Sequence, residues 1–245
     1  MSAIPDTPAP ALPRAVESAI FLGSVGLFAL FVALKLGAPE VYTAIIQEDA
    51  LLENAQAVAY ALAGVLAFVS AGALLRRGHR RLALLNALLG GALLFVCMEE
   101  ISWGQRIFDV ATTEWFARRN TQRELTLHNL APVQKLIHAG YIAIGLYGGL
   151  GWLFVRRSSL PAADPRRFCT ADPAASVYFL ALAFVYLLLG RAGAWAADVF
   201  GLVHLHVGDL LVWRDQEPAE TMGALGFLAV TASNLAKARR LQPRR

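Results

Sequence analysis

The chain has 245 residues, of which 57% are apolar and only 16% are charged, and its formal net charge is +4. Soluble domains average about 45–50% apolar and about 25% charged residues. The composition therefore excludes an ordinary water-soluble globule and a disordered chain, and it predicts an integral membrane protein.

A helix needs about 20 mostly apolar residues to span a bilayer, and six segments meet or nearly meet that length. A proline-rich flexible tail over residues 1–17 precedes them, and a basic tail over 237–245 follows. The single transmembrane domain between the tails, residues 18–236, contains predicted spans at 18–34, 54–75, 82–100, 134–155, 173–191 and 218–236. The last span is short and reaches spanning length only if it includes Glu220. We therefore expect an all-α fold, a six-helix transmembrane bundle.

Basic residues indicate how the bundle lies in the membrane. They cluster after the second span, after the fourth span and in the C-terminal tail: Arg76, Arg77, Arg80 and Arg81; Arg156, Arg157, Arg166 and Arg167; Lys237, Arg239, Arg240, Arg244 and Arg245. With six spans, these clusters and the N-terminus share one side, and the positive-inside rule makes it cytoplasmic. The sequence thus predicts a multi-pass protein of the bacterial inner membrane with both termini in the cytoplasm. We interpret the clusters as topology signals and lipid contacts, and expect no nucleic-acid partner.

The acidic residues gather on the opposite, outer side, which points to chemistry or docking there. Two outer stretches, 104–125 and 198–213, mix large apolar side chains with polar and charged ones. Such a mixture is typical of amphipathic helices that lie among lipid headgroups. We expect both to cap the outer face of the bundle.

Glu99 and Glu100 end the third span in the sequence CMEEISWGQR. Carboxylates are unfavourable at a helix C-terminus, and they are costly near hydrocarbon unless partnered. Adjacent helical residues point about 100° apart, so at most one of the two faces the bundle interior, and the other should face water or headgroups. Two interpretations stay open: a metal ligand or proton acceptor, and a salt bridge to an outer arginine.

The most polar outer segment is NTQRELTLHN, residues 120–129. Glu124 and His128 are four residues apart and share a face if the segment is helical. Such a pair can bind one metal ion, or the carboxylate can orient the imidazole as a base; it can also be a structural hydrogen-bonded pair. Within the fourth span, His138 is interpreted as a hydrogen-bonded interior residue, and Gly145 and Gly149 on its face predict close helix packing.

Four segments together carry a resemblance to known sequences: EDxxxE before the second span, EEISWGQRIF after the third, NxQxExxxHN in the outer loop, and ExxE opening the last span. Over about residues 48–230 the chain resembles an uncharacterised family of bacterial polytopic membrane proteins. The resemblance implies a topology and a candidate site, but no reaction.

We expect the polar segments to converge at the outer leaflet. The favoured hypothesis is a metal-dependent hydrolase or transferase that acts on a lipid or lipid-linked headgroup. Glu100, Glu124 and His128 would bind zinc or manganese, and Glu53 and Glu99 would be catalytic. The supporting polar residues are Asp49, Trp103, Gln105, Asn120, Gln122, Asn129, His204, His206, Asp209, Glu217 and Glu220.

Several of these residues also have a purely structural interpretation, because acidic residues at helix starts serve as caps. The main alternative function is a non-catalytic accessory or assembly subunit of a larger membrane complex, built on ion pairs with outer arginines. A proton-coupled transporter is third, because it would need charged groups near the bilayer midplane, where only His138 qualifies.

Overall fold

The computed structural model describes residues 12–47, 50–105, 107–155, 160–189 and 213–244. Within these ranges the protein is helical, and its pairing of extended backbone is limited to one isolated antiparallel bridge between Asn120 and Leu130. The helices are α1 (Arg14–Gly37), α2 (Pro39–Ile45), α3 (Leu51–Arg76), α4 (Arg80–Glu100), α5 (Glu114–Arg119), α6 (Ala131–Leu150), α7 (Arg166–Cys169), α8 (Ser176–Leu189) and α11 (Gln216–Arg240).

Among the described residues, five helices are long and apolar enough to cross a membrane: Arg14–Gly37, Leu51–Arg76, Arg80–Glu100, Ala131–Phe154 and Arg166–Leu189. They coincide with the first five predicted spans, and they support the class of an all-α, multi-pass membrane protein. These spans could be located from the sequence because a helix that crosses a bilayer needs about 20 mostly apolar residues.

The sixth predicted span coincides with α11, which does not meet the same standard of length and apolarity. Its surroundings explain the difference. α11 packs against α3, α8 and α1, and more than half of its 25 residues are buried. A helix enclosed by other helices presents little surface to lipid, so it can contain polar residues such as Thr231 and Asn234.

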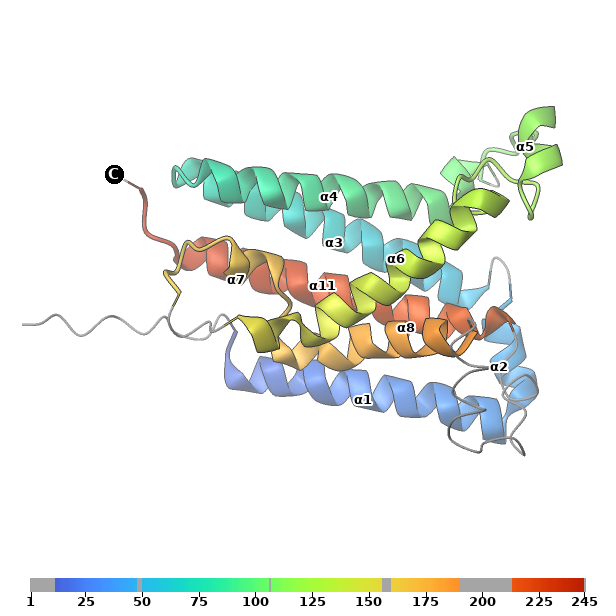
Figure 1. Cartoon of the computed structure of the whole chain (residues 1–245), viewed down its shortest axis with the longest axis horizontal. Coiled ribbons are helices and arrows are strands. Elements are labelled where there is room, and N and C mark those ends of the chain that lie inside the picture. Colours follow the sequence, from blue (N-terminus) through green and yellow to red (C-terminus); the bar gives the residue numbers. More distant parts are fainter. Residues whose placement is uncertain (1–11, 48–49, 106, 156–159, 190–212, 245) are drawn as a thin grey trace, which may run out of the picture.

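Figure 1 shows α1, α3, α4, α8 and α11 along the long axis of the molecule, with α6 crossing them obliquely. The turn between α3 and α4, α7 and the C-terminus lie at one end, which we call the basic end. α2 and α5 lie at the other. There α3 and α11 begin and α4 ends, so this acidic end contains Glu53, Glu99, Glu100, Glu217 and Glu220. Glutamates of α3, α4 and α11 therefore lie at one end, and the basic α3–α4 turn and C-terminal segment lie at the other.

Glycines bring two pairs of helices into close contact. On α6, a Cβ atom on Gly148 would lie 2.4 Å from the Phe179 ring of α8, and one on Gly145 would lie 2.6 Å from the Ala183 backbone. On α3, a Cβ atom on Gly64 would lie 2.8 Å from the side chain of α4 residue Leu94. The predicted close packing of α6 is thus confirmed, and α3–α4 and α6–α8 are tightly packed pairs.

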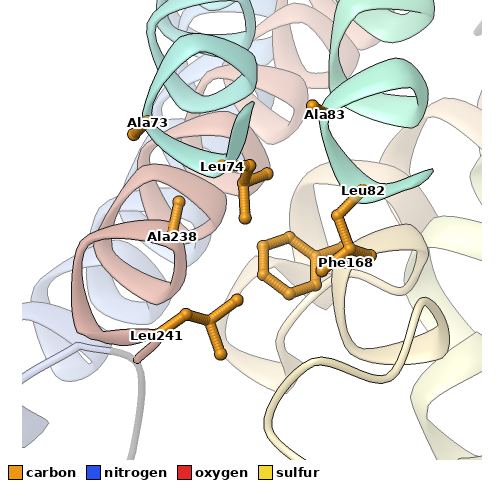
Figure 2. Packing of buried hydrophobic residues seen from close by; sticks show 7 residues of the cluster. All are labelled: Ala73, Leu74, Leu82, Ala83, Phe168, Ala238 and Leu241. Atoms are coloured by element: carbon orange, nitrogen blue, oxygen red, sulfur yellow. The ribbon is translucent and has the colours of Figure 1, made fainter. Parts of the chain in front are cut away.

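The basic end has its own core, in which Figure 2 shows the Phe168 ring directed between side chains of α3, α4 and α11. The cluster consists of Ala73, Leu74, Leu82, Ala83, Phe168, Ala238 and Leu241. It joins α7 to the ends of three long helices.

A buried polar network lies next to this core. The Asn234 amide donates to the Phe168 carbonyl at 2.9 Å and to Asn86 Oδ1 at 3.3 Å. The Lys237 ammonium donates to the Arg167 carbonyl at 2.9 Å and lies 3.3 Å from the Asp172 carboxylate. The network gives partners to polar groups that would otherwise be buried alone.

The predicted amphipathic element over 104–125 is helical only over α5, whose Glu114 and Arg118 form an exposed ion pair of 3.0 Å. The expected amphipathic helix therefore forms over only part of this stretch. The reason lies at Gly104 and Asp109, whose left-handed backbone (φ +77° and +52°) interrupts any helix. Nearly all of the second stretch, 198–213, lies outside the described residues.

Candidate functional site

The carboxylate of Glu99 joins the last turn of α4 to the loop over residues 120–130. Its Oε1 accepts a hydrogen bond from the Trp103 indole at 2.6 Å. Its Oε2 accepts the backbone N–H groups of Leu127 at 2.7 Å and His128 at 2.9 Å. Glu99 is only 4% exposed, so of the two adjacent acids it is the more buried one, and Glu100 is partly exposed. The loop folds over Glu99 and supplies the donors that a buried carboxylate needs.

The turn after α4 adopts an unusual backbone. Ser102, Trp103 and Gly104 all have left-handed φ angles, of 49°, 55° and 77°. A bulky residue such as tryptophan is strained in that region. The Trp103 indole contacts Glu99, and the Ser102 hydroxyl donates to Glu124 at 2.6 Å, so side-chain contacts hold the strained turn in place.

Asn120 determines the shape of the loop. Its Oδ1 accepts the backbone N–H groups of Gln122 at 2.9 Å and Glu124 at 3.3 Å, and its amide donates to the Thr126 carbonyl at 2.8 Å. Asparagine bonds of this kind compete with the helical hydrogen-bond pattern. The segment 120–129 is therefore not helical, and the predicted helical face shared by Glu124 and His128 is wrong.

His128 is oriented by Glu99. Its Nδ1 lies 3.2 Å from Glu99 Oε2, so Nδ1 carries a hydrogen that it donates to the carboxylate. The other ring nitrogen, Nε2, takes no part in this contact. Burial lowers the pKa of His128, but the hydrogen bond to Glu99 and the negative charges of neighbouring glutamates outweigh burial and raise the pKa above its usual value. A carboxylate that holds one imidazole nitrogen typically prepares the other for a metal ion or a proton.

His128 also lines a cavity of about 70 Å³ at the acidic end of the bundle, which we call the acidic cavity. Its lining residues are Glu53, Glu100, Gln122, His128, Asn129, Gln134, Ile137, His138, Tyr141, Tyr186, Arg214, Gln216, Glu217 and Glu220. They come from α3, α4, α6, α8, the start of α11 and the loop. A volume of that size holds several water molecules or a partly hydrated ion.

Four carboxyl groups share this cavity. Glu53 lies in the first turn of α3, Glu100 is the last residue of α4, and Glu217 and Glu220 lie in the first turns of α11. All four are close enough to interact electrostatically. Among the described lining residues, Arg214 is the only arginine or lysine. Because acids exceed bases in a partly desolvated space, the cavity favours a cation or retained protons.

Polar side chains from the spans line the cavity or contact its carboxyl groups. The Tyr186 hydroxyl donates to Glu220, and its ring packs edge-on against the His138 ring with centroids 4.7 Å apart. The amide of fully buried Gln56 donates to the Glu217 carboxylate at 3.0 Å. Tyr186, Tyr141 and Gln56 were not among the site residues predicted from the sequence. Their signal was a polar group within an apolar span, which is expensive unless it has a partner.

A second contact fixes the start of α11. Asp215, only 3% exposed, accepts a hydrogen bond from the Tyr42 hydroxyl of α2 at 2.7 Å and pairs with the Lys35 ammonium of α1. Burial, followed by the hydrogen bond to Asp215, raises the pKa of Tyr42. Together α1 and α2 therefore hold the helix that presents Glu217 and Glu220.

The remaining predicted site residues fall into three groups. Gln122 and Asn129 line the acidic cavity, as expected of supporting residues. Glu124 and Gln105 are not among its lining residues; Gln105 accepts the Leu125 N–H at 2.8 Å within the loop. Four predicted residues lie outside the described ones: Asp49, His204, His206 and Asp209.

In the described part of the chain, no three histidine, cysteine, aspartate or glutamate side chains are grouped as a metal ion would require. The acidic cavity nevertheless holds donors of the right chemical kind. Carboxylate and imidazole groups on its wall include Glu100, Glu217 and His128, which interact electrostatically with one another. Rotation of these side chains into the cavity would be needed for them to share one ion.

Comparison with models of protein families, with curated proteins and with solved structures gives no match for this chain. The resemblance to an uncharacterised bacterial membrane family stays a prediction. The chain's shared features with membrane proteins are its helical bundle and its five apolar helices.

Proposed function

We propose that α11 is a sixth transmembrane span and that the acidic end faces the outside of a bacterial inner membrane. The basic turn between α3 and α4 and the basic C-terminal segment lie together at the other end, which supports a cytoplasmic location for both. This orientation puts the acidic cavity at the level of the outer-leaflet headgroups.

We further propose that the protein is a metal-dependent hydrolase or transferase that acts on a lipid or lipid-linked headgroup. The observation that carries the proposal is that His128, oriented by Glu99 through Nδ1, lines the same cavity as four carboxyl groups. Imidazole nitrogen and carboxylate oxygen are ligands that zinc and manganese accept. A divalent cation would also offset the excess of negative charge in the cavity.

The geometry revises the roles that the sequence suggested. Both Glu99 oxygens are engaged by the turn and the loop, so we assign Glu99 as a positioning residue that holds His128. Glu217 replaces Glu124 in the proposed ligand set, because Glu217 lines the cavity. The ligands would then be Glu100, Glu217 and His128.

Glu53 lines the same cavity and remains the proposed general base. In a hydrolysis step it would take a proton from the attacking water, whose oxygen would bond to the phosphoryl or acyl centre. A divalent ion held by Glu100, Glu217 and His128 would supply polarisation of that centre. The bond to the leaving oxygen would then break, and that oxygen would receive the proton. A transferase would use an acceptor hydroxyl in place of water.

The decisive experiment is the metal content of detergent-purified protein, measured by elemental mass spectrometry. The wild type should retain one divalent metal ion per chain, and Glu100→Gln and His128→Gln should each lose it. Glu114→Gln is the matched control, because Glu114 is an exposed acid on α5, away from the cavity. It should retain the metal.

Chelation gives a second readout that needs no substrate. Removing an ion that binds only the folded protein should lower its thermal midpoint, since bound ligand stabilises by about 2.7 kcal/mol at a hundred times Kd. Absence of metal from freshly purified wild type, together with no thermal response to zinc or manganese, would overturn the proposal. It would favour an accessory subunit held together by the same polar groups.

A further inference from the structure

A second cavity, of about 260 Å³, lies nearer the basic end, between α4 and α6. It is lined by Leu85, Asn86, Leu89, Ile144, Tyr147, Gly148, Phe168, Cys169, Ala171, Phe179, Phe227, Val230 and Asn234. Most of these side chains are apolar or aromatic. We call this space the apolar cavity.

The packing of the helices explains why the space exists. α4 is held close to α3 at Gly64 and Gly90, whereas α6 is held close to α8 at Gly145 and Gly148. Each pair packs tightly within itself, and α6 runs obliquely to α4 (Figure 1). The two pairs therefore leave room between α4 and α6, and α11 residues such as Val230 form part of the lining.

The two asparagines that line the apolar cavity already have partners. Asn86 donates to the Leu82 carbonyl at 2.9 Å, and Asn234 donates to the Phe168 carbonyl at 2.9 Å. Both asparagines are almost fully buried. The cavity therefore offers apolar surface rather than charge to an occupant. Because it lies at the level of the membrane spans, the occupant that suits it is a hydrocarbon chain.

The apolar cavity and the acidic cavity share the same four long helices, α4, α6, α8 and α11. On α11, Glu220 lines the acidic cavity and Val230 lines the apolar cavity. Ten residues of α-helix separate them, or about 15 Å. The hydrocarbon layer of a bilayer is roughly 30 Å thick, and one lipid chain reaches through about half of it. The distance between the two cavities therefore matches the reach of one lipid chain.

We propose that the apolar cavity binds a hydrocarbon chain of the same lipid whose headgroup occupies the acidic cavity. This inference rests on the proposed function and names the substrate class: an outer-leaflet lipid with at least one chain that spans a full leaflet. The headgroup would meet Glu100 and His128, and the chain would descend between α4 and α6 toward Leu89 and Ile144.

A photoreactive lipid tests the chain site. The full-length protein is reconstituted in phosphatidylethanolamine vesicles that contain a trace of phosphatidylethanolamine with a diazirine in one acyl chain. After irradiation, labelled peptides are identified by mass spectrometry. α1 is the internal reference for ordinary boundary lipid, because most of its residues are exposed on the bundle surface. Labelling of α4 and α6 around Leu89 and Ile144 should exceed that of α1.

A matched pair of variants isolates the cavity. Leu89→Trp fills the cavity, whereas Leu88→Trp adds the same side chain to the adjacent position, which is 62% exposed on the helix surface. We expect Leu89→Trp to reduce the excess labelling roughly tenfold and Leu88→Trp to leave it unchanged. Ile144→Trp, with Leu146→Trp as its surface control, repeats the test from α6 if Leu89→Trp does not fold.

Equal labelling of α1 and the cavity peptides, or labelling that both cavity variants retain, would overturn the inference. The metal measurement separates the two proposals. Metal retained with no specific labelling refutes the chain site alone. Specific labelling that Leu89→Trp abolishes, in a protein that binds no metal, refutes the metal-dependent reaction but leaves a lipid-chain site.

Discussion

Replacing Glu99 by glutamine tests whether this carboxylate holds the 120–130 loop over the end of α4. Glutamine has one acceptor oxygen where glutamate has two. With that oxygen toward Leu127 and His128, its amide group faces the Trp103 indole, which lies 2.6 Å from the native oxygen. Two donors then oppose each other in a buried site.

The expected cost follows from these contacts. A buried donor without an acceptor costs about 1–3 kcal/mol, and hydrogen bonds to a charged group are each worth about 1.5–3 kcal/mol, part of which the neutral amide forfeits. We expect the closed loop to lose about 2–4 kcal/mol of stability. Since 1.4 kcal/mol is a factor of ten, the population of the open loop rises roughly 30- to 700-fold.

Hydrogen exchange followed by mass spectrometry measures that population at the Leu127 and His128 amides, which Glu99 protects directly. Their protection should fall by the same factor, while the central peptides of α3 and α4 keep theirs. Glu114→Gln is the control, because its exposed ion pair is worth about 0–1 kcal/mol and lies outside the loop. If Glu99→Gln and Glu114→Gln exchange alike, Glu99 does not hold the loop.

Two further predictions concern the packing of the bundle. Gly148→Ala should lower the thermal midpoint by an amount equivalent to about 1–3 kcal/mol, because its Cβ would lie 2.4 Å from the Phe179 ring. Gly140→Ala on the same helix is the control: its Cβ would meet nothing within 4 Å, so stability should stay equal or rise. Equal midpoints for the two variants would contradict the close packing of α6 on α8. Asp215→Asn should destabilise the folded protein by about 3–5 kcal/mol in the same melting assay, because Lys35 loses the buried carboxylate that pairs with it. A loss below about 1 kcal/mol would show that the contact does not anchor α11.

The sequence was sufficient for the five apolar spans, because length and hydropathy alone determine where a chain crosses hydrocarbon. The sixth helix was predicted within a few residues of its observed bounds, since Pro218 and the nearby acids indicate a helix start. Its enclosure between α3 and α8 was not predictable, because burial depends on contacts between residues far apart in the chain.

The acidic site was predicted in part. Glu53, Glu100, His128 and Glu220 do line one cavity, which the placement of polar groups at one end of the spans indicated. The position of Glu124 was predicted from helical spacing, and that failed because the Asn120 side chain bonds to the backbone of its own loop.

The composition of α11 has a consequence for how the protein is made. This helix contains Glu217, Glu220 and Lys237. Its transfer alone from the insertion channel into the bilayer would therefore cost substantial free energy. Its packing partners α3 and α8 precede it in the chain and would already be in the bilayer when it is synthesised. As the proposed sixth span, α11 would therefore depend on assembly for its insertion, with Gln56 and Tyr186 supplying partners for its acids.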